Sequence, residues 1–227
     1  MRNKKGFTLA ETLISLAIIG VIAALTLPNL NANVVDAQIG PKLAKAVSTF
    51  EQANQAYLNA QEVDAITDAV NFSNTSNSAY VNGLTDHMKA SIVDNSETVY
   101  KDVSVSVPSG FPLLSGLAKA NSIQTKDGML FFVAGKSNSD YTGTAPHKYR
   151  TGAVYVDING ISKPNEVGTD IFAFSLFNDG SLIPVGLNGW MEDGDLWTSK
   201  CSVNSVPSNP IFCTAHIFAN NLKVLYK

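Results

Sequence analysis

The feature that most constrains this chain is a long apolar run close to its N-terminus. From Phe7 to Leu27 the sequence contains one charged residue, Glu11, and Pro28 follows directly. As an α-helix these roughly 21 residues would be about 31 Å long, enough to cross the hydrocarbon core of a bilayer. We therefore predict a membrane-spanning helix over residues 7–28.

A short basic leader precedes the apolar run. Arg2, Lys4 and Lys5 lie within the first six residues, and no basic residue interrupts the run. Because basic residues stay on the cytoplasmic side, this pattern predicts a cytoplasmic leader and an extracytoplasmic C-terminal domain. A secretory signal peptide fits less well, since the apolar core is too long and its far end lacks a convincing small-residue cleavage site.

Glu11 distinguishes the run from a generic membrane anchor. A carboxylate at the centre of a span costs about 2.5–3.5 kcal/mol, and less near the interface, so it normally has a partner. No Lys or Arg lies within helical reach of Glu11 on the apolar side. A plain, uncleaved anchor leaves this residue unexplained.

The segment Lys5-Gly6-Phe7-Thr8-Leu9-Ala10-Glu11 resembles the cleavage site of type IV prepilins and type II secretion pseudopilins. The resemblance implies that a dedicated membrane peptidase cuts between Gly6 and Phe7 and that Phe7 is then N-methylated. It further implies that Glu11 pairs with the N-terminal amine of a neighbouring subunit. Such a pair makes physical sense, because a new cation inside an apolar bundle needs a nearby anion.

The resemblance continues through residues 18–24 to Pro28. Thr12, Ser15 and Thr26 depart from the family, which often has aliphatic residues there. Loss of the leader removes three of the 16 basic residues. The 13 that remain and the 19 acidic residues give a net side-chain charge of −6. We expect this loss of the cationic tether to ease extraction from the membrane.

The family implies a pilin-like α+β fold, in which a long N-terminal helix packs on a small antiparallel sheet. Its implied partners are other pilin or pseudopilin subunits, prepilin peptidase and an inner-membrane assembly platform. The implied location is the cytoplasmic (inner) membrane, with a single span and an extracytoplasmic head, and then the filament.

Apolar periodicity predicts that the helix continues beyond the span, over residues 29–61, as an amphipathic segment. One helical stripe carries the apolar residues, which are Leu43, Val47, Phe50, Ala53 and Tyr57. Pro28 and the pair Gly40-Pro41 are expected to bend or break this helix.

Residues 62–227 are predicted to form the globular head. Residues 62–98 are typical of a loop region with one short helix near 83–93. Alternating or continuous apolar runs predict strands, which lie at 103–107, 129–134, 153–158, 171–177 and 182–185. A tight turn over 178–181 joins the last two as a hairpin. We expect four or five antiparallel strands, with a short helix or a final strand over 214–225.

One stretch of the head suggests a loop with special chemistry. Residues 157–170, together with the Asp179-Gly180 turn, resemble a recurrent head segment of bacterial prepilin-type secretion proteins. Some pseudopilins use a calcium-stiffened loop, and Asp157, Asn159 and Asp170 are weak calcium candidates. Their spacing is not that of an EF-hand, and turn chemistry explains Asp, Asn and Gly without an ion. No other metal or cofactor is expected.

Cys201 and Cys213 are the two cysteines of the chain. An even, closely spaced pair in an exported domain predicts a disulfide, and two free thiols are the alternative. Many pilins carry such a C-terminal bridge, so the resemblance agrees.

Other function classes find little support. A net charge of −3 gives no case for nucleic-acid binding. We expect no enzyme, because no catalytic motif is present and His87, His147 and His216 are far apart in surroundings typical of surface or loop histidines. The alternative is an extracytoplasmic ligand-binding or enzymatic domain on a generic anchor. Type II secretion, type IV pili and DNA uptake remain open, as does a major or minor subunit.

Overall fold

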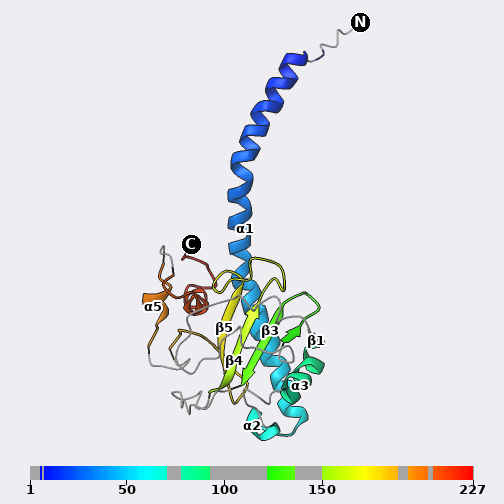
Figure 1. Ribbon diagram of the computed structural model, residues 1–227, viewed down its shortest axis with the longest axis vertical. Helices are drawn as coiled ribbons and strands as arrows, with labels where there is room; N and C mark the ends of the chain where they lie inside the picture. The colour runs from blue at the N-terminus through cyan, green and yellow to red at the C-terminus, as the bar shows by residue number, and fades with distance from the viewer. Residues whose placement is uncertain are drawn as a thin grey trace. The chain divides into compact units, whose positions relative to one another are not determined.

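The computed structural model describes residues 6, 8–70, 78–92, 122–135, 150–188, 194–203 and 207–226, without the side chains of 26–35 and of Ile92 (Figure 1). It divides into two compact units, Met1–Gln38 and Ile39–Lys227. We call the second unit the head. The strand expected over residues 103–107 lies outside the described residues.

Helix α1 runs from Leu9 to Ala60 without interruption. A break at Pro28 or at Gly40-Pro41 was therefore wrong, whereas the bend that was the alternative stays a prediction. Each proline removes one backbone hydrogen bond, but the turns on either side keep theirs. Gly40 has a packing reason, because a Cβ there would lie 1.9 Å from the carbonyl oxygen of Leu222. The glycine thus lets the C-terminal segment approach the helix backbone.

The apolar stripe predicted on the second half of α1 is confirmed. Four of its five members are buried in the head, and Val47 is partly buried against the same core. Lys42, Lys45 and Gln52 lie on the opposite, exposed face. This half of α1 is therefore amphipathic and supplies one wall of the head core.

A six-stranded antiparallel sheet forms the centre of the head, with its strands in sequence order. The strands are β1 (Ser91–Ile92), β2 (Ser122–Gln124), β3 (Leu130–Gly135), β4 (Arg150–Asp157), β5 (Ile171–Phe177) and β6 (Leu182–Pro184). The antiparallel sheet is confirmed, and it has more strands than the four or five expected. β1 and β2 are too short for a periodic pattern to reveal them.

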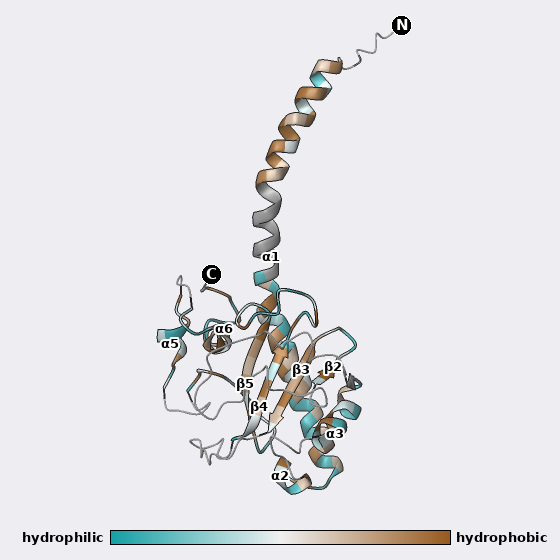
Figure 2. Ribbon diagram, viewed as in Figure 1, coloured by the Kyte–Doolittle hydropathy of each residue, from teal (hydrophilic) through white to brown (hydrophobic). Residues whose placement is uncertain are grey.

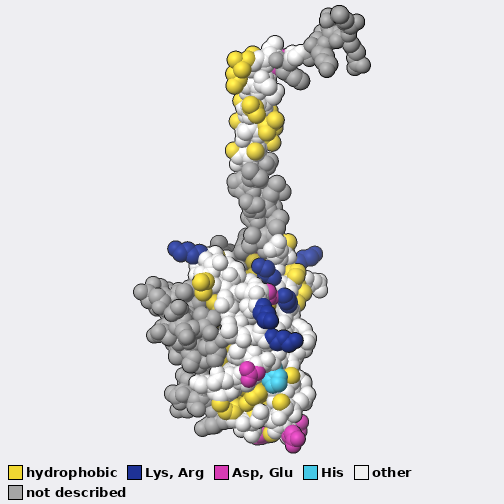
Figure 3. Space-filling view, turned by 90° about the vertical axis from the view of Figure 1, so that its right-hand side faces the viewer, with side chains coloured by type: hydrophobic (Ala, Val, Ile, Leu, Met, Phe, Trp, Pro, Cys, Tyr) yellow, Lys and Arg dark blue, Asp and Glu magenta, His cyan; other side chains and the backbone are white. Residues whose placement is uncertain are grey.

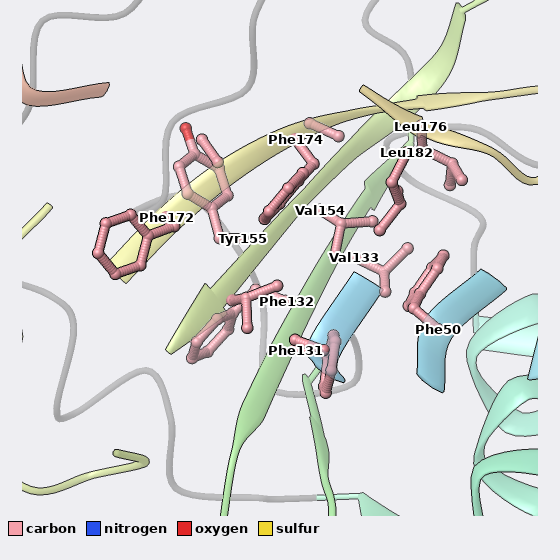
Figure 4. Close-up of a cluster of buried hydrophobic side chains, with 14 of the residues drawn as sticks. Phe50, Phe131, Phe132, Val133, Val154, Tyr155, Phe172, Phe174, Leu176 and Leu182 are labelled. Carbon is pink, nitrogen blue, oxygen red and sulfur yellow. The ribbon is translucent and has the colours of Figure 1, made fainter. Parts of the chain in front are cut away.

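The three long strands are buried along their whole length. On one face, Phe131 of β3 stacks on Phe50 of α1 with ring centroids 5.9 Å apart (Figure 4). Register continues this face through Val133, Val154 and Phe174, which are paired across β3, β4 and β5. Each such side chain contributes about 1.5–3 kcal/mol through burial, so the contact between α1 and the sheet is the main apolar layer of the head.

Two helices, α2 (Ile66–Ala69) and α3 (Ser78–Met88), follow α1. One helix near 83–93 was expected, so the prediction placed α3 too late. Its buried residues are Tyr80, Val81, Leu84 and Met88. α3 lies close to α1 at Gly83. A Cβ on this residue would come within 2.2 Å of the Tyr57 ring.

The C-terminal part contains α5 (Trp197–Lys200), the 3-10 helix η3 (Pro210–Phe212) and α6 (Cys213–Ala219). Of the two expectations for this end of the chain, the helix is the correct one. α6 packs on the sheet through an edge-to-face contact of Phe218 with Phe174, at a centroid distance of 5.8 Å.

A buried polar junction joins α1, α3 and the β5–β6 turn. Asn54 is 1% exposed, and its side-chain oxygen accepts a 2.6 Å hydrogen bond from the Tyr80 hydroxyl. Its amide nitrogen lies 1.3 Å from the place that a Cβ on Gly180 would occupy, and Gly180 has φ +83°. The turn therefore needs glycine for both its backbone conformation and its space.

We expect Gly180→Ala to destabilise the head more than Gly128→Ala. Both glycines have positive φ, but no atom lies within 4 Å of a Cβ on Gly128. Gly128→Ala carries only the conformational penalty of about 1–2 kcal/mol. Gly180→Ala adds about 1–3 kcal/mol of overpacking against Asn54. Chemical denaturation of the full chain in detergent measures both, and equal losses would contradict the junction.

Candidate functional site

The first described turns of α1 carry large apolar side chains that nothing in their own unit covers. Nine of them are 56–79% exposed, namely Leu9, Leu13, Ile14, Leu16, Ile18, Ile19, Val21, Ile22 and Leu25. Their positions go round the whole helix, and Figure 2 shows this part of α1 coloured mostly as hydrophobic. A helix that is apolar all round needs lipid or protein neighbours.

None of the described helices has both the length and the hydropathy of a membrane span. The expectation that residues 7–28 cross a membrane is therefore not confirmed by the structure.

Glu11 and Thr8 form a reciprocal cap at the start of α1. One carboxylate oxygen of Glu11 accepts hydrogen bonds from the Thr8 backbone N–H at 2.8 Å and from its hydroxyl at 2.9 Å. The Thr8 hydroxyl oxygen in turn accepts from the Glu11 backbone N–H at 3.3 Å. This is a capping box, and it places the carboxylate at the positive end of the helix dipole. Glu11 thus has a partner within its own chain.

Sequence reasoning missed Thr8, although a Thr three residues before a Glu at the start of an apolar run is the signature of this box. Thr12 and Ser15 depart from the aliphatic residues that the family often has at these positions. Their hydroxyls donate to the carbonyl oxygens of Thr8 and Glu11, at 2.9 and 2.8 Å. Because helix carbonyls satisfy both hydroxyls, these residues suit an apolar environment better than their type suggests.

The expected cleavage site lies just before α1. Gly6 is exposed, and no atom lies within 4 Å of the place a Cβ would take. Phe7 lies outside the described residues. The peptide after Gly6 therefore precedes the helix, in a segment where helical hydrogen bonding does not hold the Gly6 backbone.

Cys201 and Cys213 form the predicted disulfide, with Cα atoms 5.2 Å apart. The bridge attaches the start of α6 to the residue that follows α5. Under the chain-entropy account, closing a loop of this length stabilises the fold by about 3 kcal/mol.

His216 lies beside this bridge and is fully buried, contrary to the surface position expected. Its Nδ1 is 2.7 Å from the carbonyl oxygen of Cys201, so Nδ1 carries the proton and donates. The Trp197 and Tyr226 rings meet the imidazole edge to face, at centroid distances of 5.3 and 5.0 Å. Burial lowers the pKa of His216, and the bond to Cys201 opposes this shift.

The head loop brings the three calcium candidates together. Asp170 accepts from the backbone N–H of Asn165 and Glu166, at 2.8 and 2.6 Å, and from the Asn159 amide at 3.2 Å. Asp157 accepts from the Asn159 backbone N–H at 3.1 Å. Both carboxylates are buried. This bonding is turn chemistry, and calcium binding stays a prediction. Across the described residues, no three His, Cys, Asp or Glu side chains are grouped to hold a metal.

Removal of the Thr8 hydroxyl should loosen the cap on Glu11. We expect Thr8→Val to weaken the first turn of α1 by about 0.5–2 kcal/mol, the range for loss of an N-cap side chain. Thr12→Val is the matched control, because the Thr12 hydroxyl bonds only to helix carbonyls. Hydrogen exchange of the N-terminal peptide in micelles should be faster in Thr8→Val alone. Equal exchange in the two variants would contradict the cap.

Stability should also fall at mildly acidic pH because of His216. As pH drops below about 6.5, the unfolded chain binds a proton at this histidine before the folded chain does. The full contribution of His216 to the free energy of unfolding is therefore present above about pH 6.5. It declines as pH falls toward the lowered pKa. Denaturation between pH 7.5 and 5 measures this. His216→Asn should flatten the slope and keep the bond to Cys201.

Comparison with known protein families finds one match, which lies at the N-terminus. Residues 1–27 match the prokaryotic N-terminal methylation motif. No curated protein and no solved structure matches the chain. The motif implies a membrane-anchored protein that is processed by prepilin peptidase and assembles with other pilin subunits. The chain therefore carries the prepilin-type cleavage and methylation segment of pilins and pseudopilins, on a pilin-like α+β fold.

Proposed function

We propose that this chain is a structural subunit of a type II secretion pseudopilus or a type IV pilus-like filament. Prepilin peptidase cuts it between Gly6 and Phe7, Phe7 is N-methylated, and subunits assemble through α1. The observation that carries this proposal is the methylation motif, followed by nine exposed apolar side chains on one helix.

The geometry at Glu11 supports the assembly step. Cleavage creates an amine at Phe7, one residue before the Thr8 N–H that already bonds to Glu11. One oxygen of Glu11 accepts both hydrogen bonds from Thr8, which leaves lone pairs on the carboxylate for a cation. We infer that the amine of a neighbouring subunit binds there, where the surrounding apolar helices strengthen the attraction.

The remaining parts follow from this proposal. Before assembly the chain is a single-pass protein of the inner membrane with an extracytoplasmic head, and its partners are other subunits and the assembly platform. The disulfide agrees with an oxidising compartment. The head has a structural role and is not an enzyme.

The N-terminus and Glu11 provide the test. Mass spectrometry of the mature protein should show loss of residues 1–6 and a methylated Phe7. Crosslinking in the membrane should give ladders for wild type and a loss of at least tenfold for Glu11→Ala. Glu11→Gln is the matched control for shape, and should also fail because it carries no charge.

An intact Met1 would reject the proposal. So would a Glu11→Ala variant that assembles like wild type, since both results describe a protein on a generic anchor.

A further inference from the structure

Exposed lysines gather at one end of the head. Lys42 and Lys45 lie on the first turns of α1 within the head, and Lys126 lies in the β2–β3 turn. The pair Lys45 Nζ–Asp127 Oδ2, at 2.6 Å, joins this turn to the helix. Lys223 follows Leu222, whose carbonyl lies against Gly40. We call Lys42, Lys45, Lys126 and Lys223 the basic end, and Figure 3 shows lysines gathered there.

The basic end keeps an excess of positive charge. Asp127 is bonded to Lys45 and offsets that lysine. The neighbouring 157–170 loop adds one exposed cation, Lys163, and one exposed anion, Glu166, which offset each other. Within the part of the chain that the structure describes, Lys42, Lys126 and Lys223 therefore form no ion pair with a carboxylate.

Exposed carboxylates gather at the opposite end of the head, just after α1 ends at Ala60. Glu62, Asp64 and Asp68 are all exposed, and the described segment 61–70 contains no basic residue. We call these three residues the acidic end. Asn178 of the β5–β6 turn holds this segment, because its backbone and side-chain oxygens accept from Ile66 N–H at 2.8 Å and Thr67 N–H at 3.0 Å. The carboxylates are thus attached to an ordered part of the fold.

The two ends cannot neutralise each other within one molecule. From Lys45 to Ala60 the helix rises by about 22 Å, which is more than two Debye lengths at physiological ionic strength. Within the described residues the two ends thus leave each other unpaired, and a second copy can supply the missing opposite charge. The whole chain is acidic, with a net charge of −3, so a long polyanion would be repelled by most of its surface.

We propose that the basic end of one head binds the acidic end of the head of a second copy. This inference rests on the proposed function. Because the two surfaces differ, the contact is heterologous and repeats from copy to copy, which builds an open array rather than a closed dimer. Charge at the rim of such a contact mainly sets orientation and rate of encounter. The head thus gives each subunit an orientation relative to the next.

Charge reversal tests the contact. Lys42→Glu with Lys126→Glu inverts the basic end, and Asp64→Lys with Asp68→Lys inverts the acidic end. We expect each pair to lower the yield of sedimentable filament from the full chain at least tenfold. The four substitutions together should restore at least half of it, because attraction returns with its sign exchanged. Wild-type assembly should also weaken as NaCl rises from 50 to 500 mM.

Lys200→Glu on α5 is the control, since it changes the same charge outside both ends and should leave the yield unchanged. Unfolding curves of every variant check that folding is intact. A combined variant as defective as either pair would overturn the proposal, as would normal assembly of both pairs. Binding of wild type to duplex DNA, lost in the lysine pair while assembly is unchanged, would overturn it in favour of a polyanion.

The N-terminal mass of wild type and the effect of Glu11→Ala on assembly are measured in the same experiment. A processed, Glu11-dependent filament that ignores charge reversal would reject the head contact alone. A wild type that is not processed and forms no filament would reject both proposals.

Discussion

The structure depends on one helix that meets two environments. From Ile39 onward α1 is amphipathic, and its buried stripe forms the layer on which the sheet packs. Between Leu9 and Leu25 the same helix exposes apolar side chains on every side. A single regular helix can do both because periodicity, and not backbone geometry, decides which surface is buried. Within the proposed function, fold and assembly are thus encoded in different halves of one element.

The most polar group of the apolar half is placed where a helix tolerates it best. Glu11 occupies the first turn of α1, where unpaired backbone N–H groups and the helix dipole favour an anion. Thr8 completes the arrangement by donating to the carboxylate. The proposed pairing with a neighbouring amine therefore adds to a local contact that exists already. This explains physically how a carboxylate persists in such a helix before any neighbour is present.

The sequence predicted best where periodicity was strong. The stripe on α1 and the strand over 171–177 were both correct, because each repeats at a clear period. Prediction failed where tertiary contacts decide. α1 continues through Pro41, and His216 is buried by rings from two distant segments. Neither the continuation of α1 through Pro41 nor the burial of His216 has a signal in the local sequence. Asp157, Asn159 and Asp170 lie together in the fold, and calcium binding there stays a prediction; the hydrogen bonds to Asp170 could be known only from the fold.

The uncovered helix has a kinetic consequence. Burial of nine large apolar side chains is worth on the order of 10 kcal/mol even by a cautious sum. That energy corresponds to a factor of about ten million in an equilibrium constant. A lone subunit with this surface in water is therefore too rare to serve as a diffusing intermediate. Within the proposed function, departure from lipid and arrival at a growing tip have to be one concerted event, with each turn of helix leaving acyl chains only as another subunit replaces them.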